Sequence, residues 1–261
     1  MLTGLGFAKT REIALTIDDL PFVGEKKNFH LNMIIDSIKT NEIPATGFVI
    51  AREIGTQNWP LLQKFREAGL SLGNHTFSHK NLNTVDSATY IHEIERADKI
   101  LAPVLSEPKF FRFPYLAMSE GEKKNKIVEY LAAKDYQIAP ITIDSRDFVF
   151  NQLLMGVPEA KRREFLEALK PCYLAFIWQQ TLKAEENYKA NHTQILLIHA
   201  NLLNAYALPD IIRLYKEHGY RFVSLQHALN IPTKETLEAS VSAPKLIAKK
   251  NSFLDTFFAW D

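Results

Sequence analysis

Short apolar or β-branched runs recur along the chain, and each has the length of a buried strand. They predict strands at 13–17, 47–50, 70–72, 110–113, 138–143, 195–198 and 221–225. Between most of these runs the apolar positions follow helical spacing instead. Leu31, Ile34, Ile35 and Ile38 stand at i, i+3, i+4 and i+7, which predicts one buried face of a helix.

Three more helices are predicted. One carries a second apolar stripe and begins after Asp86 or Ser87 as its N-cap. The residues of that stripe are Tyr90, Ile91, Ile94, Ala97 and Leu101. The other two begin near Pro60 and near Pro209 and end at Gly69 and Gly219, because proline is favoured in the first helical turn and glycine just past the last.

Strands that alternate with helices indicate a parallel sheet with helical crossovers, and seven of them favour a closed or nearly closed barrel. We expect one α/β domain over residues 1–261, with its core at about 12–230. Residues 151–193 are rich in helix formers and aromatic residues, which favours an extra helical layer over a substrate lid. Residues 231–261 lose clean periodicity and are expected to form an irregular surface segment. Its docking residues would be Phe253, Phe257, Phe258 and Trp260.

Composition narrows the choice of partners. Lysine and arginine total 31 against 30 aspartates and glutamates, so the net charge of +1 offers no field that would hold nucleic acid or an anionic membrane. No apolar run approaches the roughly 20 residues of a membrane span. The N-terminal residues show neither the basic nor the apolar region of a signal peptide. Cys172 stands beside an apolar run and is expected to be a buried, inert hydrophobe.

Polar clusters follow the predicted strands, at the face where barrel enzymes keep their active sites. The first strand is followed by Asp18 and Asp19, of which one can ligate a metal while the other serves as a base. The third is followed by His75 and His79, four residues apart, whose imidazoles can reach one point. Two imidazoles and one carboxylate leave a coordination position open for water, as a catalytic divalent metal requires. The residues alone allow either aspartate to be the ligand.

Two more clusters carry charge. Arg112 leaves an apolar strand and needs a carboxylate partner, either in an ordinary structural ion pair or at a reaction site. His199 ends another apolar strand, where a satisfied core histidine is the plainer interpretation. If His199 is paired with a carboxylate such as Asp147, it is held protonated and oriented, as a general acid must be.

These five clusters, in this order over about residues 12–225, resemble the five motifs of the NodB-type polysaccharide deacetylases, carbohydrate esterase family 4. Residues 16–21 resemble the first motif, TFDDGP, with Ile17 and Leu20 in place of phenylalanine and glycine. Residues 75–79 and 112–115 match the second and third motifs. The fourth and fifth correspond to Asp147-Phe148, where the family has Asp-Trp, and to Leu197-Ile198-His199. The detailed pattern is similar to bacterial proteins of the xylanase/chitin deacetylase group.

The resemblance implies a distorted (β/α)7 barrel and a role for each matched residue. Asp19, His75 and His79 would hold a divalent ion, typically zinc, with cobalt and manganese as alternatives. Asp18 would be the base, with Arg112 as its charge partner. The remaining implied roles are a general acid, His199, tuned by Asp147; an oxyanion donor, the backbone N–H of Tyr115; and substrate-binding residues, Phe148, Leu197 and Pro114. Phenylalanine at 148 lacks the indole N–H of the family's tryptophan, which changes the slot for the acetyl methyl group.

The function implied is removal of N-acetyl groups from a hexosamine-containing polysaccharide or oligosaccharide, such as peptidoglycan or chitin. Within enzymes, the alternatives are O-deacetylation of a xylan-like glycan and hydrolysis of a small amide. From another class, the alternative is an inactive glycan-binding barrel. The family works mostly outside the cytoplasm, while the sequence leaves the compartment, the metal and the oligomeric state open.

Overall fold

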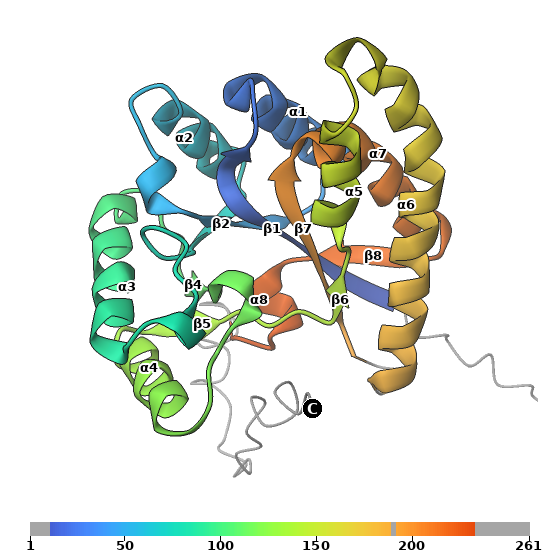
Figure 1. The fold of residues 1–261 in the computed structure, drawn as a ribbon. Helices are drawn as coiled ribbons and strands as arrows, with labels where there is room; N and C mark the ends of the chain where they lie inside the picture. Colours follow the sequence, from blue (N-terminus) through green and yellow to red (C-terminus); the bar gives the residue numbers. More distant parts are fainter. Residues whose placement is uncertain (1–10, 189–191, 233–261) are drawn as a thin grey trace, which may run out of the picture.

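The chain folds around one parallel β-sheet that curves into an incomplete barrel (Figure 1). The computed structural model describes residues 11–188 and 192–232. Its strands are β1 (Arg11–Val23), β2 (Ala45–Val49), β3 (Ser71–Asn74), β4 (Lys109–Phe111), β5 (Tyr136–Ile138), β6 (Ile143–Asp144), β7 (Gln194–Asn201) and β8 (Tyr220–Val223). Their order is β5-β4-β3-β2-β1-β7-β6, and β8 pairs with the start of β1. The predicted parallel barrel with helical crossovers is confirmed.

The strand predicted at 138–143 is wrong, because Ile138 ends β5 and Ile143 begins β6, and these two strands lie at opposite ends of the sheet. Ala139 N–H donates to the carbonyl of Phe111 beside β4, and Thr142 N–H donates to the carbonyl of Ile195 on β7. The residues between them therefore cross from one edge of the sheet to the other. Pro140 lies in this crossing and has no N–H to continue a strand ladder. Within the described ranges, no pairing joins β5 to β6, so the barrel stays open there.

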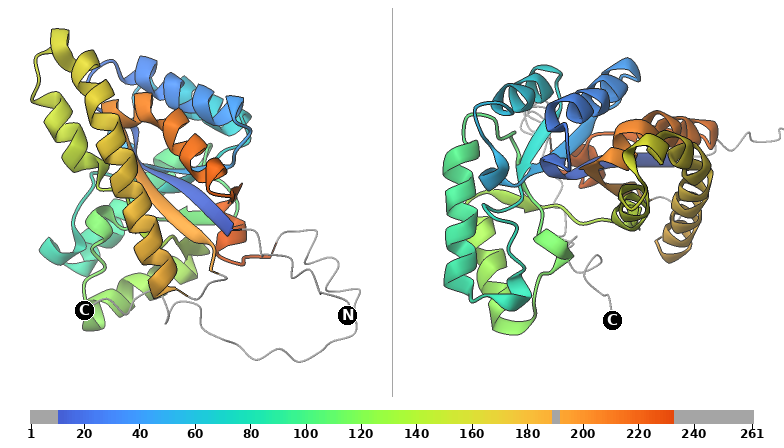
Figure 2. Two further views of the ribbon diagram at one scale, coloured as in Figure 1. Left: turned by 90° about the vertical axis from the view of Figure 1, so that its right-hand side faces the viewer. Right: turned by 45° about the horizontal axis from the view of Figure 1, so that its top comes forward.

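Helices pack around the sides and at one end of the curved sheet (Figures 1 and 2). They are α1 (Lys27–Thr40), α2 (Trp59–Glu67), α3 (Ser87–Leu101), α4 (Gly121–Ala133), α5 (Asp147–Met155), α6 (Glu159–Asn187), α7 (Leu202–Glu217) and α8 (Leu225–Ala228). Short 3₁₀ turns are η1 (Ala51–Glu53), η2 (Leu82–Thr84) and η3 (Pro114–Leu116). The apolar face predicted for α1 is fully buried. Asp86 caps α3, as predicted, by accepting the N–H of Thr89 at 2.8 Å.

Several helical details differ from the predictions. α7 begins at Leu202 rather than near Pro209, because the side chain of Asn201 caps it by accepting the N–H of Asn204. α4 has no counterpart among the predicted helices. Cys172 is exposed, because its neighbour Tyr173 belongs to the buried face of α6 and Cys172 points away from that face. No helix in the described part of the chain is long and apolar enough to cross a membrane.

The stretch 151–193 is largely helical, in the second half of α5 and in α6. α6 packs along α5 and α7 and also against the edge strand β6, so it belongs to the helices that surround the sheet (Figure 2). Residues 233–261 lie outside the described residues, and so do the four aromatic residues predicted to dock that segment. The assignment of residues 1–261 to one domain stays a prediction.

The inside of the barrel is apolar at one end and polar at the other. The apolar end is a buried cluster closed by α8; its members include Ala14, Phe48, Phe110, Ile195, Leu225 and Ala228. Side chains alternate along a strand, so residues two apart share a face. Thr16 and Asp18 therefore follow Ala14 on the inner face of β1, and His199 follows Ile195 on β7. The polar end lies at the carboxyl ends of the strands, as the sequence pattern predicted.

Candidate active site

Three predicted metal ligands come together at the polar end of the barrel. Asp19, His75 and His79 each offer a ligand atom, and these atoms lie within 4.8 Å of one another. Asp19 Oδ1 is 3.6 Å from His75 Nε2 and 3.3 Å from His79 Nε2. Asp19 and His79 have left-handed backbones, with φ of 62° and 59°. The left-handed backbone takes the Asp19 side chain out of the regular alternation of β1, and such uncommon conformations cluster at functional sites.

The chemistry of this cluster fits a cation. His75 Nδ1 lies 2.8 Å from the backbone carbonyl of Arg112, which can only accept, so the ring proton sits on Nδ1. Burial lowers the pKa of His75 to about 3 and that of His79 to about 4. Neutral His75 thus points the lone pair of Nε2 at Asp19 Oδ1, a buried oxygen with no hydrogen-bond partner among the described residues. Two acceptors facing each other are stabilised by a cation between them.

Burial also sets the protonation of Asp19. It raises the pKa of this carboxyl to about 6, with the Asp18 carboxylate adding to the effect and the charge of His199 opposing it. A bound cation would lower this pKa again and favour the charged form. Two imidazole nitrogens and one carboxylate oxygen are a ligand set typical of catalytic zinc.

Helix α3 fixes the loop that carries the two imidazoles. Ser78 donates its N–H and its hydroxyl to Glu93 Oε2, at 2.6 and 2.7 Å. The Arg96 guanidinium lies 3.5 Å from the centre of the Phe77 ring. His79 N–H donates to the hydroxyl of Thr76 at 3.0 Å. The residues between the two ligands are therefore held by side chains rather than left to loop flexibility.

Asp18 lies beside the cluster and pairs with Arg112. Arg112 Nη1 is 3.5 Å from both carboxylate oxygens of Asp18, and Nη2 donates to the hydroxyl of Thr16 at 3.2 Å. The guanidinium also lies 4.7 Å from the centre of the Phe48 ring. Burial raises the pKa of Asp18 above its ordinary value, and the charge of Arg112 limits that rise. Asp18 therefore has an increased proton affinity, as a general base benefits from.

His199 and Asp147 form a tight pair at the end of β7. His199 Nδ1 is 2.7 Å from Asp147 Oδ1, and its backbone N–H donates to Asp147 Oδ2 at 2.8 Å. Burial alone would lower the pKa of His199, but the charge and hydrogen bond of Asp147 outweigh it and raise that pKa to about 10. The imidazolium thus keeps its proton at neutral pH and has Nε2 left to donate.

The other predicted residues surround this centre. The Phe148 ring is half exposed and meets His199 edge-on, with ring centres 6.2 Å apart. Leu197 is buried two residues before His199, on the same face of β7. Pro114 is buried in η3, while Tyr115 is exposed, with its ring centre 4.5 Å from that of His79. The oxyanion role of the Tyr115 N–H and the apolar slot stay predictions.

Sequence reasoning missed the residues that hold the site residues in place. Asn201 and Asn204 both donate to Asp147 Oδ2, and Tyr173 donates to Asn204. Asn201 could have been found as a capping residue at the start of a helix. Glu93 shares the apolar face of α3, and a carboxylate on that face was the available signal. Tyr173 belongs to a helix face that is otherwise ordinary core, and no local pattern in the sequence distinguishes it.

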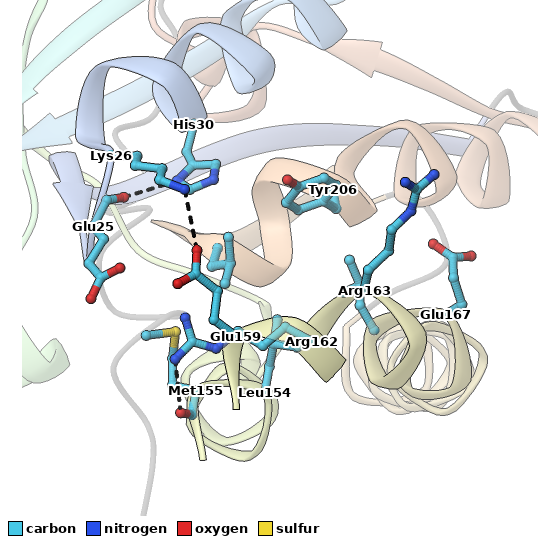
Figure 3. A pocket seen from close by; sticks show the side chains of 12 residues that line it. Glu25, Lys26, His30, Leu154, Met155, Glu159, Arg162, Arg163, Glu167 and Tyr206 are labelled. Atoms are coloured by element: carbon cyan, nitrogen blue, oxygen red, sulfur yellow. Dashed lines mark hydrogen bonds and ion pairs between the residues drawn. The ribbon is translucent and has the colours of Figure 1, made fainter. Parts of the chain in front are cut away.

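A separate cavity of about 520 Å³ lies between α1, α5, α6 and α7 (Figure 3). Its lining mixes charged side chains such as Lys26, Glu159 and Arg163 with His30 and Tyr206. None of the residues assigned above to the reaction centre lines it. It is therefore distinct from the cation cluster.

Fold and site together define a parallel barrel protein with a candidate Asp-His-His cation site at the carboxyl ends of its strands. Residues 7–138 match the sequence profile of the polysaccharide deacetylase family. That match covers half of the chain, and the chain belongs to this family, known for its NodB homology domain and as carbohydrate esterase family 4. The matched residues include the first three motifs, whereas Asp147 and His199 lie beyond them.

Chitin and peptidoglycan deacetylases are among the proteins to which the chain is similar. The chain is 29% identical over 146 residues to the chitin deacetylase of Colletotrichum lindemuthianum, covering 54% of each protein. Against the solved Bc1960 peptidoglycan N-acetylglucosamine deacetylase it has a TM-score of 0.60 at 25% identity, covering 84% of this chain and 88% of the other. A family 4 pseudoenzyme from Bacillus anthracis has the same fold, with a TM-score of 0.61 at 18% identity over 84% of this chain and 66% of the other. The chain spans about half the length, or less, of the first curated relatives.

Proposed function

We propose that this protein is a metal-dependent hydrolase that removes N-acetyl groups from a hexosamine-containing glycan of the peptidoglycan or chitin type. The observation that carries the proposal is the convergence of three groups at the carboxyl ends of β1, β3 and β7. A cation cluster, a buried carboxylate outside it and a protonated histidine are what hydrolysis of an amide needs. The names of the relatives, chitin deacetylase and peptidoglycan N-acetylglucosamine deacetylase, support the choice of substrate.

Asp19, His75 and His79 would hold the metal, and zinc suits their donor atoms best. When bound, such an ion polarises a carbonyl group and lowers the pKa of water. Asp18 stands outside this three-residue cluster, and its carboxylate pairs with Arg112. Asp18 would therefore be available to accept a proton.

The chain's own residues divide the proton transfers between them. Asp18 takes a proton from the attacking water, and its raised pKa increases its strength as a base. His199 gives the proton on Nε2 to the leaving amine, because Asp147 keeps the imidazole charged. The backbone N–H of Tyr115 would donate to the oxyanion; such donors typically contribute about 3 to 4 kcal/mol.

The inactive-barrel alternative is less well supported. A pseudoenzyme shares this fold, so the fold alone does not imply activity. This chain, however, carries the base, the three cluster residues and the acid together, with partners that set their charges.

Acetate release from three classes of substrate tests the proposal. Zinc-loaded protein is assayed on N-acetylglucosamine oligomers, on acetylxylan and on small acetamides. We expect release from the oligomers at the highest kcat/KM. Release from acetylxylan alone would replace the proposed substrate with an O-acetylated glycan, and no release from any of the three would reject the deacetylase assignment.

A further inference from the structure

We propose that Asn204 of α7 and Tyr173 of α6 are positioning residues for the acid pair Asp147–His199. This inference rests on the proposed function, in which His199 protonates the leaving amine. It also gives the long helix α6 a role at the reaction centre.

The carboxylate of Asp147 is fully buried and held from several directions. Its Oδ2 accepts the backbone N–H of His199 at 2.8 Å, Nδ2 of Asn201 at 2.7 Å, and Nδ2 of Asn204. Its Oδ1 is thereby directed at Nδ1 of His199, 2.7 Å away. The rotation of the carboxylate, and with it the aim of the imidazole, depends on the donors at Oδ2.

Asn204 can serve as a donor only in one orientation of its amide. Nδ2 donates to Asp147 Oδ2 and to the carbonyl of His199 at 2.9 Å, and both of these atoms are acceptors. Oδ1 on the other side of the amide accepts the hydroxyl of Tyr173 at 2.9 Å. If the amide turned over, its oxygen would face a buried carboxylate. The Tyr173 hydroxyl stabilises the orientation that supplies a donor to Asp147.

Tyr173 reaches this point from α6, where it is fully buried against α7. Thr181 lies eight residues after Tyr173, on the same buried face of α6. Its hydroxyl is 2.7 Å from that of Tyr215 on α7. The same pair of helices therefore contains two buried hydroxyl contacts. One connects to Asp147 through Asn204, whereas within the described residues the other makes no hydrogen bond to Asp147, His199 or Asn204, which makes Tyr215 a matched control.

The test compares two acetyl substrates in the same enzyme sample. In an N-acetylglucosamine oligomer the C–N bond breaks only as the nitrogen receives a proton, here from His199. In 4-nitrophenyl acetate the C–O bond breaks with departure of a phenolate that needs no proton. The ratio of kcat on the amide to kcat on the ester therefore reports on proton delivery, and it does not depend on the folded fraction of the sample.

We expect this ratio to fall about 3- to 10-fold in Tyr173→Phe and about 10- to 100-fold in Asn204→Ala, in line with the loss of a neutral and a charge-assisted hydrogen bond. Tyr215→Phe should leave the ratio unchanged. An unchanged ratio in both test variants, or an equal fall in Tyr215→Phe, would overturn the inference while leaving the proposed function intact. Wild-type protein that releases acetate from neither substrate would reject the proposed function, and this inference with it.

Discussion

Asp18 on β1 and His199 on β7 are direct partners in the register of two paired parallel strands. The base and the acid of the proposed reaction therefore stand side by side on the inner face of the barrel. Their surroundings give them opposite charges. Asp18 is a carboxylate buried beside one guanidinium, whereas His199 is an imidazolium paired with the carboxylate of Asp147. Opposite proton tasks on neighbouring strands are the pattern that general acid–base catalysis requires.

The separation of metal binding from proton abstraction gives a first prediction. Asp18→Asn should keep the metal and lose turnover by about 10²- to 10⁴-fold, the usual contribution of a positioned base. His75→Ala should lose metal and activity together. Metal content and kcat are measured on the same samples, and full activity in Asp18→Asn would remove Asp18 as the base.

Metal affinity should depend on pH through one carboxyl group. Asp19 has a pKa of about 6 in the metal-free protein, so below this pH a metal must displace its proton. The imidazoles of His75 and His79 have pKa values of about 3 and 4, so protons compete with the metal for them only in more acidic solution. We expect the zinc Kd to rise about tenfold per pH unit between pH 6 and 4 and to be flat above, as titration calorimetry can measure. A Kd unchanged from pH 7 to 5 would contradict the account.

The alkaline limb of activity should depend on Asp147. His199 must be protonated to act, so activity is lost as the pH rises through its pKa of about 10. Asp147→Asn removes the charge that raises this pKa and leaves the opposing effect of burial, so the alkaline limb of kcat should move to lower pH. The control is Asp144→Asn, on β6, whose carboxylate accepts the N–H of Arg146. If both variants keep the wild-type profile, Asp147 does not set the charge of His199.

Leu20 stands where the first family motif has glycine, and its side chain fills the space beside Gly47. A Cβ on Gly47 would lie 2.1 Å from Cδ1 of the fully buried Leu20. We expect Gly47→Ala to reduce the free energy of unfolding by about 1 to 3 kcal/mol through overpacking. In a Leu20→Ala background the same change should cost much less. Urea unfolding of the wild type, the two single variants and the double variant gives the coupling free energy between the two positions. Strict additivity of the free energies of unfolding would show that the positions are independent.

Much of the fold follows from local patterns in the sequence. The face of α1 is predictable because four apolar residues repeat at helical spacing and all become buried. The break between β5, which ends at Ile138, and β6, which begins at Ile143, is not predictable in this way, because a short apolar run gives no sign of which neighbouring strand each of its ends joins. Pro140 was the available signal, since it lacks the N–H that a continuous strand would use.

The site shows the same contrast. Its five clusters are visible in sequence because each follows an apolar strand, and parallel strands bring their carboxyl ends together. The residues that support them come from helices, and some of their contacts join different helices. Asn204 and Tyr173 are 31 residues apart in sequence, and their hydrogen bond exists only because α6 lies against α7. Only the folded structure reveals contacts of this kind.

The central claim is that hydrolysis depends on one cation held by Asp19, His75 and His79. The most direct test is acetate release from an N-acetylglucosamine oligomer by chelator-treated protein as zinc is added stepwise. The account predicts no release without metal and a linear rise that levels off at one equivalent of zinc per chain. Full acetate release by the metal-free protein, or none at any zinc concentration, would contradict it.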